Sequence, residues 1–88
     1  MDLETVKKAK QGNVNEIGSI ILENMSTLYR VAFSILKTED EIYDAISSTT
    51  VIVFEKINTL KNEEFFKTWM TRILINERKK KYNQNKKN

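Results

Sequence analysis

Apolar residues recur at three- and four-residue steps along nearly the whole chain, a pattern typical of helices that bury one face. A first helix is expected over Asp2–Gln11, capped by Asp2 and ended by Gly12. Asn13 followed by Glu16 resembles a capping box and predicts the start of a second helix, which we expect to continue to Lys37. Its buried stripe is expected to comprise Val14, Ile17, Ile21, Leu28, Ala32 and Ile35.

A third helix is predicted to begin after Thr38, which forms a clear capping box with Glu41. The segment Thr49–Phe54 reads TTVIVF and has high strand propensity. We predict helix there because the helical spacing continues through the segment and no turn residues bound it. The buried face of this helix is expected to comprise Ile42, Ile46, Thr49, Val53 and Ile57.

A loop is expected over Asn58–Asn62, with Asn62 capping a last helix. Phe65 and Phe66 are adjacent, so both cannot point inward, and one of them is expected to be partly exposed. The last helix is expected to bury Phe66, Trp69, Met70 and Ile73 on one face and to present Arg72, Asn76, Lys79 and Lys80 on a second, polar face.

The sequence therefore predicts an all-α protein, a compact bundle of three to four helices without an internal repeat. Its length of 88 residues suits one small domain, which we place at residues 1–82. Residues 83–88 are polar and basic, have little to bury, and are expected to form a disordered tail.

Charge divides the chain into an acidic body and a basic end. Residues 1–66 carry a net charge of −4 and residues 67–88 a net charge of +7, although the total is only +3. Such a division is expected when one face meets phosphates and another meets a protein, or when a basic tail serves only solubility.

Composition argues against an enzyme. The chain has no cysteine and no histidine, which removes thiolate metal sites, disulfides and the usual general base. Its acidic pairs lie where helix N-termini favour negative charge, and no glycine-rich phosphate loop is present. No apolar run is long enough for a membrane span and no signal peptide is recognisable, so we expect a cytoplasmic protein without cofactor or metal.

The last predicted helix suits a nucleic acid, because cations neutralise phosphates and an amide can read a base edge. Asn76 lies among aliphatic residues and would be costly to bury without partners, which favours the polar face for it. Trp69 allows two interpretations: a core anchor, favoured by its place on the apolar stripe, or a stacking surface for an unpaired base.

The order of three segments resembles the second conserved region of extracytoplasmic-function sigma factors, which are bacterial transcription initiation subunits. The segments are LYRVAFSIL (28–36), TEDEIYDAISSTTVIVFEKI (38–57) and FFKTWMTRILINERKKK (65–81). In the last segment the family pattern is matched by Phe66, Trp69–Met70, Arg72–Ile73 and Asn76. In the middle segment Asp44, Thr49, Val51 and Phe54 match, whereas Tyr43 and Ser47–Ser48 depart from the acidic and amide residues usual there.

The resemblance implies that the middle helix docks on a coiled coil of the largest subunit of RNA polymerase. It also implies that the loop and last helix capture the unpaired non-template strand of the −10 promoter element. By similarity the docking residues are Asp44, Ser47 and Ser48, and the DNA-binding residues are Asn58, Lys61, Asn62, Lys67, Arg72, Asn76, Lys79 and Lys80. An anti-sigma factor is a further expected partner. The second helical domain of the family, which reads the −35 element, is absent from these residues.

Two other classes of function remain open from the residues themselves. A helical adaptor could bind a protein through its acidic body, with an incidental basic tail. A duplex-binding helix-turn-helix protein is less favoured, because residues 58–62 lack the glycine that often occurs in that short turn.

Overall fold

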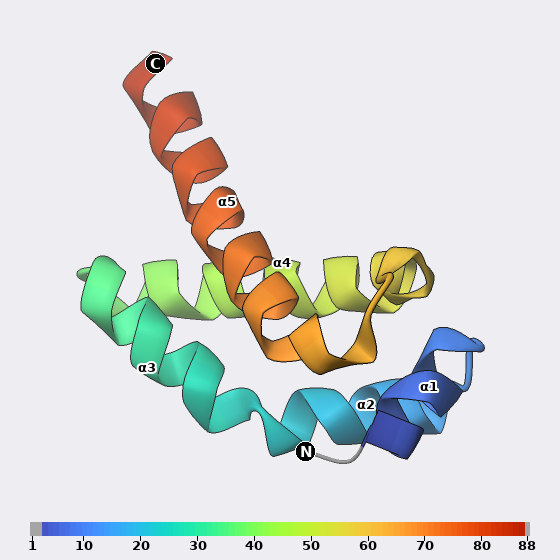
Figure 1. Ribbon diagram of the computed structural model, residues 1–88. Helices are drawn as coiled ribbons and strands as arrows, with labels where there is room; N and C mark the ends of the chain where they lie inside the picture. Colours follow the sequence, from blue (N-terminus) through green and yellow to red (C-terminus); the bar gives the residue numbers. More distant parts are fainter. Residues whose placement is uncertain (1–2, 88) are drawn as a thin grey trace.

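The protein is an all-α bundle in which a long last helix crosses the others (Figure 1). The computed structural model describes the backbone of residues 3–87 and the side chains of residues 3–80. Within that part of the chain the elements are α1 (Leu3–Lys10), α2 (Val14–Glu23), α3 (Met25–Ile35), α4 (Glu39–Lys56), the 3₁₀ turns η1 (Ile57–Thr59) and η2 (Glu63–Phe65), and α5 (Phe66–Lys87). The predicted fold class is confirmed.

Local signals in the sequence set most helix ends. Gly12 has a φ of 92°, a left-handed conformation that terminates α1 as predicted. The Asn13 side chain accepts a hydrogen bond from the Glu16 backbone N–H at 3.2 Å, so the predicted cap of the second helix is present. The expected first helix included Asp2, which lies outside the described residues.

The prediction of one helix from Asn13 to Lys37 was wrong, because the chain breaks at Asn24. The Asn24 side chain is buried, and its amide Nδ2 donates a 2.7 Å hydrogen bond to the Ile20 carbonyl. An asparagine that bonds to the preceding turn competes with the regular ladder and bends the chain. The expected stripe also changes: Val14 is 65% exposed, whereas Ile20 is fully buried in its place.

The third helix follows its prediction closely. Thr38 and Glu41 form a complete capping box at the start of α4. The strand-like segment Thr49–Phe54 is helical, and all five residues expected on the buried face are buried. Thr49 is the polar member of that face, and its hydroxyl donates to the Ala45 carbonyl at 2.7 Å. The hydroxyl is therefore satisfied inside the helix without a tertiary partner.

The core gathers one stripe from each helix. α1 contributes Val6 and Ala9, both fully buried, and α5 contributes residues one turn apart. The two adjacent phenylalanines differ as expected: Phe66 is buried, whereas Phe65 is 58% exposed. The residues of α5 that are completely buried are Phe66, Met70 and Leu74.

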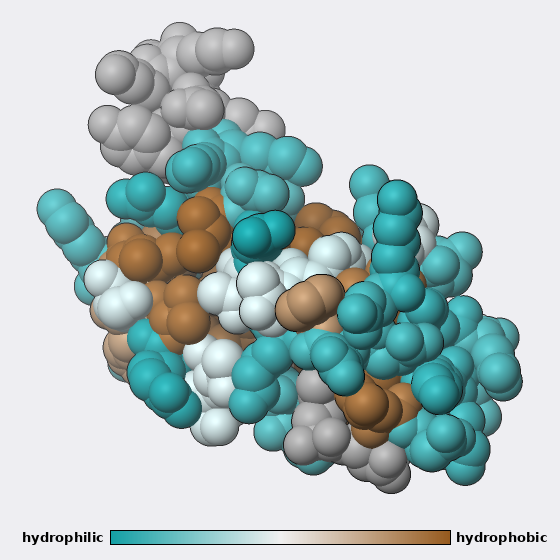
Figure 2. Space-filling model, in the orientation of Figure 1, coloured by the Kyte–Doolittle hydropathy of each residue, from teal (hydrophilic) through white to brown (hydrophobic). Residues whose placement is uncertain are grey.

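α5 crosses α4 and then continues away from the remaining helices (Figure 1). Its backbone is helical through Lys87, and the disorder expected for residues 83–88 stays a prediction. Figure 2 shows mostly hydrophilic side chains with one small apolar patch over the α1 end of the molecule, and a larger cluster of apolar side chains where α3 passes into α4 below α5. The two ends of the bundle therefore offer chemically different surfaces.

Candidate nucleic-acid interface

A hollow of about 450 Å³ opens between the C-terminal half of α4, η1 and the middle of α5. We refer to it as the α4–α5 hollow. Its floor is apolar because Ile52, Trp69 and Ile73 are only partly buried there. Its rim is polar, and it consists of three lysines, one carboxylate and two neutral residues: Lys56, Lys79, Lys80, Glu77, Thr59 and Asn76.

Trp69 packs against the core as the sequence favoured, and its other predicted role, stacking on an unpaired base, stays a prediction. Its ring packs against the core and lies 6.0 Å from the Phe66 ring, centroid to centroid, in a tilted arrangement. The side chain is nevertheless only partly buried, and its free part faces the α4–α5 hollow. A tryptophan that is anchored on one side and open on the other is a fixed platform on which a planar group can stack.

The polar side of α5 is brought together largely as predicted. Asn76, Lys79 and Lys80 line the hollow two and three turns beyond Trp69, and Asn76 is exposed. Arg72 is exposed one turn before Asn76 but is not among the residues that line the hollow. Helical spacing thus correctly placed the amide and two of the cations on one surface.

The predicted loop begins within a 3₁₀ turn, because its first two residues belong to η1. Leu60 is buried and anchors it, whereas Asn58, Lys61 and Asn62 are exposed. The Asn62 side chain accepts a 3.0 Å hydrogen bond from the Glu64 backbone N–H and caps η2 rather than α5 directly. The helix predicted to follow Asn62 therefore begins with a 3₁₀ turn.

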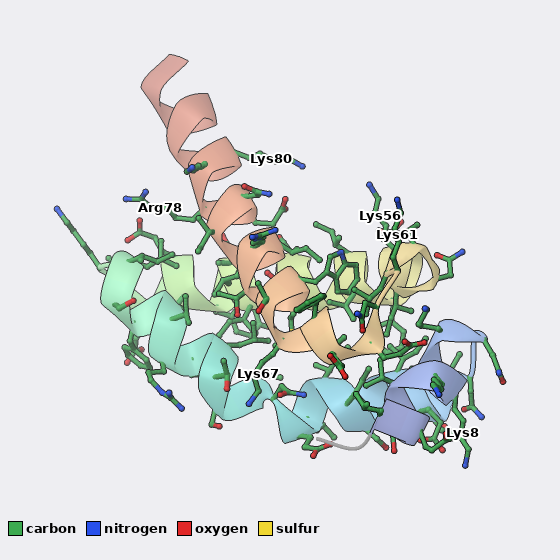
Figure 3. The ribbon with its side chains drawn as sticks, viewed as in Figure 1. Lys8, Lys56, Lys61, Lys67, Arg78 and Lys80 are labelled. Atoms are coloured by element: carbon green, nitrogen blue, oxygen red, sulfur yellow. The ribbon has the colours of Figure 1, made fainter. Side chains whose placement is uncertain are left out.

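The lysines of this region do not all face the same way. In Figure 3, Lys56 and Lys61 extend on one side of α5, and Lys80 projects from α5 toward that same side. Lys67, at the start of α5, extends toward α2 and α3 instead. Lys67 is thus apart from the side on which Lys56, Lys61 and Lys80 extend.

Several residues of the hollow were not foreseen from the sequence. Ile52 and Lys56 lie one turn apart at the end of α4, and Thr59 follows in η1. The i, i+4 spacing of Ile52 and Lys56 placed them on one face, but nothing local indicated that α5 would cross that face. Glu77 was also not predicted. Its carboxylate forms an ion pair with Lys80 at 3.2 Å, and its side chain is 13% exposed.

A second surface lies on α4, away from the core. Asp44 is exposed on it, and Ser47 and Ser48 are half-buried. The same side of the helix carries Tyr43, 70% exposed, and Val51, 57% exposed. The residues expected to dock on a protein therefore lie beside exposed apolar side chains. Such apolar surface is common at protein interfaces.

Among the described residues, no group of three acidic, histidine or cysteine residues could hold a metal ion. No helix within the described residues is long and apolar enough to cross a membrane. Buried polar side-chain atoms in that part of the chain all have partners.

Comparison with known proteins identifies the family. Residues 20–88, from the middle of α2 to the end of the chain, match the model of sigma-70 region 2. The chain belongs to the sigma-70 region 2 family. The resemblance that the ordered motifs indicated is thereby confirmed.

One relative of this region 2 chain is the RNA polymerase sigma factor SigV of Bacillus subtilis (strain 168). The two are 28% identical over 68 residues, which is 77% of this chain and 41% of that protein. The chain thus spans less than half the length of that relative. No solved structure matches the chain.

Proposed function

We propose that this chain is the −10-recognition domain of an alternative sigma factor of the extracytoplasmic-function type. It captures the unpaired non-template strand of the promoter during transcription initiation. The observation that carries the proposal is the α4–α5 hollow, where a half-buried tryptophan and an exposed amide lie inside a rim of three lysines. Family membership and the similarity to a sigma factor support it.

Each part of the hollow has a role in this proposal. Trp69 stacks on an extruded base, and Asn76 forms hydrogen bonds with a base edge. Lys56, Lys79 and Lys80 neutralise the phosphates on either side. The size of the hollow, about 450 Å³, lies within the range typical of small-molecule pockets and accommodates a single base.

The adjoining loop extends the DNA path. Asn58, Lys61 and Asn62 are exposed, and Thr59 of the same loop lines the hollow, so the strand can pass from the hollow onto these residues. Arg72 continues the same path along α5. Lys67 extends to another side of the molecule, and its assignment to DNA is the least supported of the set.

The exposed side of α4 is the proposed docking surface for the coiled coil of the largest polymerase subunit. Asp44, Ser47 and Ser48 supply polar contacts, and Tyr43 with Val51 supplies apolar area. An anti-sigma factor is the other protein partner that we propose. A coiled-coil partner can bury exposed aromatic and aliphatic residues that lie on one helix face, and this burial favours binding.

The experiment that tests DNA capture is fluorescence anisotropy with two matched probes at low salt. One probe is a library of single-stranded −10-type oligonucleotides, and the other is the same library as duplex. We expect tighter binding to a subset of the single strands, with an affinity that falls as salt is added. Equal or tighter binding to the duplex library would contradict the proposal and favour a helix-turn-helix mode.

Docking is tested separately by retention of core RNA polymerase on the immobilised chain. The double variant Tyr43→Ser, Val51→Ser removes apolar area from an exposed face of α4. Because neither side chain is in the core, this variant should fold. We expect the double variant to retain less polymerase than the parent. A matched control replaces Leu22, which is 73% exposed on α2, by Ser. If the control and the double variant behave alike, the α4 surface is not where polymerase binds.

A further inference from the structure

α1 lies outside the region that matches the family model, yet it is joined to the segment proposed to read DNA. The match begins at residue 20, ten residues after α1 ends at Lys10. α1 contacts α2, η1 and η2, and its apolar side is fully buried through Val6 and Ala9. We refer to Asn58–Asn62 as the recognition loop. The helix is thus packed against η1, which includes the first two residues of this loop, and against η2, which directly follows it.

One ion pair connects α1 to the far end of that loop. The Lys10 Nζ atom lies 3.2 Å from Glu63 Oε1, and the two residues are 53 positions apart in the sequence. The two side chains are only 21% and 23% exposed. Partial burial weakens screening by salt and restricts both side chains, so this pair is better ordered than an ordinary surface ion pair.

Glu63 is well placed to transmit this restraint to the loop. It directly follows Asn62, the last residue of the recognition loop, and begins η2. The Phe65 backbone N–H donates to the Asn62 carbonyl at 3.0 Å, which closes the turn around Glu63. The pKa of the Glu63 carboxyl is below its ordinary value, because its own backbone N–H and then the Lys10 ammonium donate hydrogen bonds to it.

We propose that the Lys10–Glu63 ion pair positions the recognition loop, so that α1 is a working part of the DNA-reading surface although it lies outside the matched region. Lys10 and Glu63 are positioning residues, since they act through the loop and not by touching the base. The DNA part of the proposal rests on the proposed function. The restraint on the loop does not.

The restraint is tested in the free protein by hydrogen exchange. The probes are the backbone amides of Leu60 and Phe65, which form 3.0 Å hydrogen bonds at the two ends of the loop. In Lys10→Met and Glu63→Gln we expect both amides to exchange about two- to five-fold faster, as for loss of a modest ion pair. The control is Lys8→Met, an exposed lysine of the same helix. Unchanged exchange in both variants would overturn the proposal.

The consequence for DNA is tested by the ratio of affinities for preferred and scrambled single strands. Glu63→Gln separates positioning from charge, because removing a carboxylate on its own should strengthen binding to all strands. We expect instead a ratio reduced about two- to five-fold in both Lys10→Met and Glu63→Gln, and a ratio close to the parent in Lys8→Met. Uniformly tighter binding by Glu63→Gln with the ratio unchanged would refute the DNA role.

A charge-reversed pair provides the rescue. Lys10→Glu combined with Glu63→Lys keeps the net charge and restores opposite charges. We expect amide exchange to be slower, and the ratio of affinities to be higher, than in either single reversal. No recovery would mean that the side chains act separately. If the parent chain shows no preference among single strands, the proposed function fails, and hydrogen exchange still decides whether α1 holds the loop.

Discussion

The Lys80 ammonium lies 3.2 Å from the Glu77 carboxylate within the hollow assigned to DNA, and Glu77 is the more buried partner. A carboxylate at this position repels phosphate and engages a lysine that would otherwise be available to the strand. We therefore expect Glu77 to lower the affinity of this surface for a single strand.

Replacement of Glu77 by Gln should consequently strengthen single-strand binding and make it more dependent on salt, because Lys80 becomes free to neutralise a phosphate. The slope of log affinity against log salt should steepen by up to about 0.7, the value for one more phosphate contact on a single strand. Anisotropy titrations at several salt concentrations measure this. Glu23→Gln, on α2, makes the same change in net charge away from the hollow and should leave the slope near that of the parent.

Replacement of Asn76 by Ala should relax sequence preference while leaving overall affinity for unrelated strands nearly intact. The amide is exposed at the rim of the hollow, where it can form hydrogen bonds with a base edge. A lost base contact of this kind costs about 1–3 kcal/mol for the preferred base. Competition between preferred and substituted oligonucleotides gives the result, and an unchanged ranking of sequences would remove Asn76 from the readout.

Replacement of Lys79 by Ala should weaken binding to all sequences alike. Lys79 is an exposed cation at the rim, and a phosphate contact carries no base information. The salt slope should fall by about 0.7. A change in the ranking of sequences, instead of a uniform loss, would show that Lys79 contacts a base.

Trp69 offers a direct optical test, because it is the only tryptophan in the chain. The fluorescence of its partly buried ring should be quenched when a base stacks on it. Trp69→Leu keeps apolar volume against Phe66 but removes most of the stacking surface, and should weaken single-strand binding by about 1–3 kcal/mol. Trp69→Phe retains an aromatic face and is the matched control. Equal affinities for the Leu and Phe variants would rule out stacking.

Replacement of Thr38 by Ala should destabilise the fold without changing the DNA surface. The Thr38 hydroxyl accepts from the Glu41 backbone N–H at 3.1 Å, and the Glu41 carboxylate accepts from the Thr38 backbone N–H at 3.1 Å. Loss of such a cap costs about 1 kcal/mol, which chemical denaturation can resolve. Thr38→Ser keeps the hydroxyl and should remain close to the parent.

The fold was largely predictable because its signals are local. The capping box at Thr38 and the left-handed Gly12 each act within a few residues, and both were identified correctly. The break at Asn24 was missed because an asparagine within a helical pattern can face solvent or bond to the preceding turn. Only burial of its side chain against the core decides between these.

The candidate site was predicted in part for a related reason. Asn76, Lys79 and Lys80 share a face by helical spacing alone, so their grouping followed from the sequence. Lys67 was assigned to DNA by the family resemblance, yet its side chain extends toward α2 and α3. Ile52, Lys56 and Thr59 come from a different element and could not be joined to α5 without knowing how the two helices cross.

The sequence by itself determined the helices, most of their ends, and the grouping of an amide and cations beyond an aromatic stripe. These depend on contacts between residues three or four positions apart, which the order of residues fixes directly. Tertiary structure alone decided that α4 and α5 enclose a hollow, that Glu77 lies inside it, and that Lys10 meets Glu63 across 53 residues. Such relationships depend on how buried faces pack together, because packing sets the distances between residues that are remote in the chain.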